Sequence, residues 1–160
     1  KGLFARDIKP ASYAGLEFSP TAIELAANNG VKLLPQSVEE HSIDHRERYD
    51  IVCSFQVLEH VGSPRTFLDA AVRCLKPGGK LMVSVPAEDG FARHAFWDAL
   101  NMPPHHVTRW TDAALRFIAP AWVSNEDPGR NKLRPDHGIV RGAAFGFHKE
   151  MGWCTSMTLP

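Results

Sequence analysis

The sequence predicts an α/β fold with a doubly wound, mostly parallel sheet. Two short apolar runs, 13–18 and 49–55, are typical of strands that are buried on both faces. Each run is followed by a hydroxyl residue and a proline, Ser19-Pro20 and Ser63-Pro64, a pair that favours the start of a helix. Because strands and helices alternate over short connections, we expect parallel strands covered by helices.

Four segments have the composition of buried strands. Residues 13–18 (YAGLEF) and 31–34 (VKLL) are short and apolar. Residues 49–55 (YDIVCSF) give the clearest signal, because three apolar residues stand in a row. Residues 80–85 (KLMVSV) predict the next strand, and the polar residues 35–48 predict a connection with a helical turn.

Three helices are predicted between and after these strands. The first stops at Gly30 and the second at Pro77-Gly78-Gly79, while Thr111 caps a third helix that Pro120 ends. The apolar stripes comprise Ile23, Ala26 and Ala27 in the first helix and Phe67, Leu68, Ala71, Cys74 and Leu75 in the second.

Composition narrows the class of protein. In 160 residues, 18 Lys and Arg balance 18 Asp and Glu, so charge gives no reason to expect a nucleic-acid or membrane partner. No run approaches the ~20 apolar residues that cross a bilayer. The three cysteines, Cys53, Cys74 and Cys154, are far apart, which favours a reducing compartment. A cytoplasmic enzyme acting on small molecules is therefore expected.

One domain in two parts is predicted. Residues 1–120 carry the alternating pattern and form the expected core. Residues 121–160 are expected to be a C-terminal extension of the same domain, polar and turn-rich over 124–138 and weakly β in character beyond that stretch.

Glu17 ends the first predicted strand, at the sheet edge where ligands bind in such folds. A carboxylate there can accept hydrogen bonds from both hydroxyls of a ribose, each contributing roughly 1.5–3 kcal/mol. The alternative is a solvated acid near a helix N-terminus. Because enzymes that use a nicotinamide cofactor also place an acid here, Glu17 does not identify the cofactor.

Two longer motifs do point to a cofactor. The run YDIVCSFQVLEHV, a helix, and then LKPGGKLMVSVP resembles the class I S-adenosylmethionine-dependent methyltransferase superfamily, of the small-molecule type. The resemblance covers roughly residues 2–118 and includes LEFSPTAIELA as the second strand and following helix of that fold. It implies a Rossmann-like sheet and S-adenosyl-L-methionine as the cofactor.

The resemblance implies a set of cofactor-binding residues. Glu17 would bind the ribose and Ser37 would lie beside the adenine, where many relatives carry an acid. Phe55 and Gln56 would line the methionine moiety. The full set comprises Glu17, Phe18, Ser19, Ser37, Val38, Phe55, Gln56 and His60. His60 is more typical of a residue that hydrogen-bonds its turn than of a catalytic one.

The turn that contains Glu59 and His60 also raises the question of whether a metal ion binds there. Some relatives bind a divalent ion through an ExxEH arrangement, but this chain has Gln56 in the first position, before Glu59 and His60. Because an amide replaces a hard anionic ligand, we predict no metal here.

A histidine pair follows the last core strand. The segment from Met102 to Thr111 resembles the PxHxxxW/F element on the acceptor side of small-molecule methyltransferases. His105 and His106 are therefore predicted as catalytic residues that take a proton from the acceptor. The alternative for each histidine is a structural role, in which its side chain caps a carbonyl. Three aromatic residues before this segment suggest a lid over the acceptor, although packing in the core would explain them equally well: Phe91, Phe96 and Trp97.

The glycine-rich turn of the resemblance, and the strand before it, are not found in the sequence. That strand would lie between 13–18 and 49–55, so the expected sheet lacks its first strand at the centre. Upstream residues, another chain or the C-terminal tail could fill the slot, or the sheet could close differently. We favour a truncated product completed by self-association in a homo-oligomer, with impaired cofactor affinity.

The sequence thus predicts methyl transfer to the oxygen or nitrogen of a small-molecule acceptor, whose identity it does not specify. One alternative is an inactive methyltransferase-like module for binding or dimerisation, which the missing turn favours. A second is an NAD-dependent oxidoreductase, which shares the reasoning for Glu17 but not the LEH and LKPGG motifs.

Overall fold

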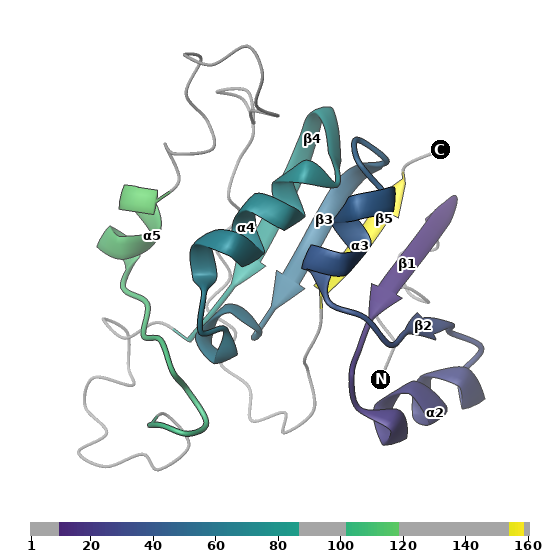
Figure 1. The fold of residues 1–160 in the computed structure, drawn as a ribbon, viewed down its shortest axis with the longest axis horizontal. Helices are drawn as coiled ribbons and strands as arrows, with labels where there is room; N and C mark the ends of the chain where they lie inside the picture. The colour runs from purple at the N-terminus through teal and green to yellow at the C-terminus, as the bar shows by residue number, and fades with distance from the viewer. Residues whose placement is uncertain (1–9, 87–101, 119–153, 159–160) are drawn as a thin grey trace.

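The computed structural model describes residues 10–86, 102–118 and 154–158, which form a five-stranded sheet with helices packed on it (Figure 1). The order of the strands is β2-β1-β5-β3-β4. In chain order the elements are β1 (Ser12–Leu16), α2 (Pro20–Asn28), β2 (Leu33–Leu34), α3 (Val38–Asp44), β3 (Tyr49–Phe55), the 3-10 turn η1 (Leu58–His60), α4 (Pro64–Arg73), β4 (Leu75–Ser84), α5 (Asp112–Ile118) and β5 (Cys154–Thr158).

Two parallel strand pairs confirm the predicted α/β class. β1 pairs with β2 and β3 pairs with β4, both in parallel, while α3 and α4 lie side by side over one face of the sheet (Figure 1). The main core fills the space between that face and the two helices. Its most buried members are Val52, Leu58, Ala71, Cys74 and Leu75.

The central slot of the sheet is filled by the C-terminal segment of the same chain. β5 runs antiparallel to both of its neighbours, with Ser156 opposite Ala14 on β1 and opposite Val52 on β3. Of the routes to closure that the sequence left open, the described residues therefore show the C-terminal one. A second copy of the chain is not needed to complete the sheet.

The two proline-led helices begin in different ways. Ser19 caps α2 as predicted, with Oγ accepting a hydrogen bond from Ala22 N–H at 3.4 Å. Ser63 stands at the same position before α4, but its side chain makes no cap hydrogen bond, so that part of the prediction is wrong. Ala27 is exposed rather than part of the apolar face, whereas Ala26 is buried as predicted, together with Ala22.

The LKPGG segment belongs to a strand rather than to the end of a helix. α4 ends at Arg73, and β4 already begins at Leu75, which pairs with Tyr49. The register then shifts, so that Ile51 faces Lys80. The extra residues form an irregularity in the strand that re-aligns the pair, as a bulge does.

Gly79 sits at this irregularity with no room for a side chain. A Cβ there would lie 2.9 Å from the Lys76 carbonyl oxygen and 3.1 Å from that of Asp50, both backbone atoms that cannot yield easily. We expect Gly79→Ala to lower the free energy of unfolding by about 1–3 kcal/mol in urea denaturation. Gly62→Ala is the matched control, because a Cβ at Gly62 meets no atom within 4 Å. Equal stabilities of the two variants would contradict this packing.

None of the helices in the described segments combines the length and the apolar character needed to span a bilayer. Several predictions fall outside the described residues, so the structure does not bear on them. They concern Phe91, Phe96, Trp97, Pro120 and the extension between β5 and α5.

Candidate functional site

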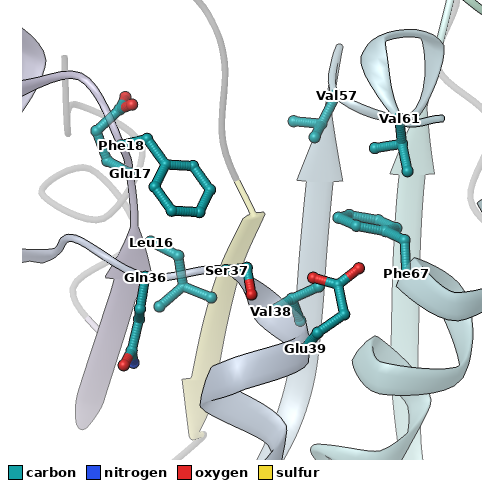
Figure 2. A pocket seen from close by; sticks show the side chains of 10 residues that line it. All are labelled: Leu16, Glu17, Phe18, Gln36, Ser37, Val38, Glu39, Val57, Val61 and Phe67. Atoms are coloured by element: carbon teal, nitrogen blue, oxygen red, sulfur yellow. The ribbon is translucent and has the colours of Figure 1, made fainter. Parts of the chain in front are cut away.

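An open cavity of about 550 Å³ of empty space lies where the parallel strands β1 and β3 end (Figure 2). Four of the predicted cofactor-binding residues line it: Glu17, Phe18, Ser37 and Val38. The wall is completed by Leu16, Gln36, Glu39, Val57, Val61 and Phe67. Figure 2 shows Glu17 and Phe18 at one end and Val57, Val61 and Phe67 at the other.

Glu17 is held firmly at one end of the cavity. Its backbone N–H donates to the Leu34 carbonyl at 3.0 Å, which extends the β1–β2 pairing by one residue. Its Oε1 accepts a hydrogen bond from Ser19 N–H at 2.7 Å, and the residue is only 1% exposed. Ser19 does not line the cavity, so its described contacts orient Glu17 and cap α2.

Ser37 and Val38 enter the cavity wall because α3 begins there. Ser37 is the N-cap, and its Oγ accepts from Glu40 N–H at 3.1 Å. In return, the Glu40 carboxylate accepts a hydrogen bond from Ser37 N–H at 2.8 Å, and the two bonds together form a capping box. The polar groups of Ser37 are therefore directed at the helix end, and buried Val38 supplies an apolar surface.

The other predicted cofactor residues, Phe55, Gln56 and His60, are not among the residues that line the cavity. Gln56 adopts a left-handed backbone conformation with a φ of 55°. Its backbone N–H donates to the Ser84 carbonyl at 2.8 Å and its Nε2 to Ser84 Oγ at 3.3 Å. The turn thereby directs Gln56 to β4, and Val57 and Val61 face the cavity instead.

The LEH turn and the histidine segment, far apart in the sequence, are joined by backbone hydrogen bonds. The Glu59 carbonyl accepts from Val107 N–H at 2.9 Å and from Thr108 N–H at 3.1 Å. Thr108 Oγ1 donates to the Leu58 carbonyl at 2.9 Å and accepts from Trp110 Nε1 at 3.0 Å. His105 and His106 thus lie beside this turn and do not line the cavity.

Three side chains at this junction could together bind a metal ion. The ligand atoms of Glu59, His60 and His106 lie within 4.8 Å of one another. His60 Nδ1–H donates to the His105 carbonyl at 2.5 Å, which leaves Nε2 facing the Glu59 carboxylate at 4.0 Å. Burial raises the pKa of Glu59. Sequence reasoning missed this cluster, because His106 is 46 residues from His60 in the chain.

Behind the cavity, Gln36 is tied to a buried histidine. Gln36 Nε2 donates to His41 Nδ1 at 2.5 Å, and His41 Nε2–H donates to Tyr49 Oη at 2.8 Å. The His45 ring stacks on that of His41 with centroids 3.8 Å apart. Burial, then His45 and Arg48, lower the pKa of His41 to about 4, against a smaller opposing effect of Asp44.

This depressed pKa gives a definite pH dependence. Because the unfolded chain binds the His41 proton below pH 6.5 and the folded chain only below about 4, stability falls as the pH drops between those values. We expect a loss of about 2 kcal/mol between pH 7 and 5, measured by urea unfolding. His41→Gln should remove that slope, whereas the exposed-site variant His105→Gln should keep it. A wild-type slope that survives in His41→Gln would contradict the assignment.

An α/β sheet with two parallel strand pairs and a cavity at their carboxyl ends has the arrangement in which many α/β domains bind small molecules. A family model described as a methyltransferase domain matches residues 1–121. The chain therefore belongs to this family of methyltransferase domains.

Curated relatives agree with the family. The ubiquinone biosynthesis O-methyltransferase of Klebsiella pneumoniae is 28% identical over 123 residues, which cover 71% of this chain and 51% of the relative. Those of Salmonella enteritidis and Salmonella arizonae are 35% identical over 101 residues, 58% of this chain and 40% of each relative. The chain thus spans about half the length, or less, of the relatives it matches.

Proposed function

We propose that this chain transfers the methyl group of S-adenosyl-L-methionine to a small-molecule acceptor. The observation that carries the proposal is the cavity at the carboxyl edge of the sheet. It is lined by four of the predicted cofactor-binding residues: Glu17, Phe18, Ser37 and Val38. A carboxylate held by β1 at one end of a mostly apolar space suits a nucleoside, whose ribose hydroxyls are donors and whose base is flat and apolar on its faces.

The acceptor atom is proposed to be oxygen. This choice is supported by the relatives, which are named O-methyltransferases. The sulfonium of the cofactor supplies an activated methyl group, so the protein needs to align the acceptor, exclude water and, for a hydroxyl, take up its proton. We assign that last role to His105 or His106, because their segment resembles the acceptor-side element of small-molecule methyltransferases; neither residue is among those that line the cavity.

The test is a calorimetric titration of the chain with S-adenosylhomocysteine, with NADH in parallel. Saturable binding of the first and none of the second is the expected result. Binding of NADH alone would overturn the proposal in favour of the oxidoreductase. Failure of both ligands to bind would favour the inactive binding module. The measured affinity for S-adenosylhomocysteine also tests the expectation that cofactor binding is impaired.

Two further expectations belong with this function. We keep the prediction of no metal, because Gln56 is directed to Ser84 rather than to the cluster at Glu59. Saturable zinc binding that His106→Ala abolishes would contradict it. A cytoplasmic location and a homo-oligomer also remain proposals, and sedimentation of the purified chain tests the second.

A further inference from the structure

The wall of the cavity at the start of α3 is tied to β3 by a chain of three side chains. Residues 36–39 follow one another in the sequence, and all of them line the cavity (Figure 2). Gln36 Nε2 donates a hydrogen bond to His41 Nδ1, and His41 Nε2–H donates to Tyr49 Oη at 2.8 Å. His41 and Tyr49 are buried and do not line the cavity. The His41 ring therefore reaches the cavity wall through Gln36.

Two elements of the fold hold the His41 ring in place. Tyr49 belongs to β3, and its backbone N–H donates to the Cys74 carbonyl at 3.0 Å. His41 belongs to α3, where its backbone N–H donates to the Ser37 carbonyl at 3.0 Å. Because the sheet and the helix both fix the ring, the ring can in turn hold the Gln36 amide.

The protonation state of His41 suits this role. Since Nε2–H donates to Tyr49, Nδ1 carries the lone pair that accepts from Gln36. Burial is the largest cause that lowers the pKa of His41 to about 4, so the ring is neutral near pH 7 and keeps this lone pair. The link between Gln36 and His41 is therefore intact at neutral pH.

Gln36 is also joined to the carboxylate end of the cavity through a shared acceptor. The Leu34 carbonyl accepts hydrogen bonds from Glu17 N–H and from Gln36 N–H, both at 3.0 Å. Gln36 thus connects the strand end that carries Glu17 with the first turn of α3. A displaced Gln36 would change the spacing between Glu17 and the wall at residues 37–39.

We infer that His41 is a positioning residue for the ligand cavity: held by Tyr49 on β3, it fixes Gln36 and thereby sets the wall at residues 36–39 against Glu17. The inference rests on the proposed function, which places the nucleoside of the cofactor between these two parts of the cavity. His41 touches no ligand in this scheme, and its effect on affinity passes through Gln36.

The experiment measures S-adenosylhomocysteine binding by calorimetry at pH 7 on the full chain. Gln36→Leu removes the amide and should weaken binding about tenfold, as expected when a hydrogen bond that orders the wall is lost. His41→Leu should weaken binding by the same factor. His41→Asn should stay within about twofold of the wild type, because the Asn carbonyl oxygen can replace Nδ1 as the acceptor for Gln36.

A double variant distinguishes positioning from a general loss of stability. If His41 acts through Gln36, the chain with both Gln36→Leu and His41→Leu should bind no more weakly than Gln36→Leu alone. Val72→Ala is the matched control, because Val72 is a buried side chain of α4 that does not line the cavity. It should lower the thermal midpoint and leave the affinity unchanged.

Three results would each overturn the inference while the wild type still binds S-adenosylhomocysteine and the proposed function stands. They are wild-type affinity in Gln36→Leu, a His41→Leu loss that adds to that of Gln36→Leu, and binding by His41→Asn as weak as by His41→Leu. If the wild type does not bind S-adenosylhomocysteine, the proposed function fails and the inference fails with it.

Discussion

Ser156→Pro should strongly lower the thermal stability of the protein. Ser156 lies in the middle of β5, with β1 on one side and β3 on the other. Proline has no N–H to donate and fits badly inside a central strand, at a cost of about 3 kcal/mol or more. We expect the midpoint of thermal unfolding, followed by circular dichroism, to fall by about 10 °C or more.

Two further variants show whether the lost backbone hydrogen bonding of β5 causes the destabilisation. Ser156→Ala keeps the N–H, so its midpoint should stay within a few degrees of the wild type. Deletion of residues 154–160 removes both strand pairings at once and should be at least as damaging as the proline. If the proline variant has the same midpoint of thermal unfolding as the wild type, β5 does not lie between β1 and β3.

Glu17→Ala should weaken S-adenosylhomocysteine binding by about a hundredfold in the calorimetric titration. A ribose offers two hydroxyls to this carboxylate, and each charge-assisted hydrogen bond contributes roughly 1.5–3 kcal/mol. Removing both acceptors therefore costs roughly 3 kcal/mol or more, which corresponds to that factor. Glu17 also holds Ser19 N–H, so the variant's thermal midpoint must be measured alongside its affinity.

Glu24→Ala is the control, because Glu24 is an exposed acid on α2, the helix that Ser19 begins. It removes the same charge close by in the chain and should leave affinity unchanged. A Glu17→Ala chain that folds normally and binds as tightly as the wild type would remove Glu17 from the proposed cofactor site.

The parallel strands could be predicted because their signals are local. The β3 segment has consecutive apolar residues, and its predicted bounds agree with Tyr49–Phe55. β5 could not be placed, since the pattern beyond residue 120 is weak and its position depends on pairing with strands a hundred residues earlier. The start of β4 at Leu75 was missed for a related reason: proline and glycine usually end elements, and here they form an irregularity inside one.

The residues of the candidate site also fall into those that the sequence predicts and those that it does not. Glu17 could be predicted at the cavity because a strand end marks the ligand edge of the sheet, and Phe18 was predicted there from the resemblance to the methyltransferase family. Glu39 and Gln36 lie in a stretch that composition marks only as polar, so nothing in the sequence separates them from Glu40, which caps. The contact between the Glu59 turn and Val107 is set by tertiary packing and has no local signal.

The antiparallel insertion of β5 also sets the timing of assembly during synthesis. Cys154 follows Ser84, the end of β4, by 70 residues, so at roughly 5–20 residues per second the two parallel pairs wait about 4–14 s for the strand that joins them. During that interval β1 and β3 each present an open edge of unpaired backbone groups, which other nascent chains can add to. Yield in cells should therefore depend on chaperones that shield those edges until the ribosome has delivered β5.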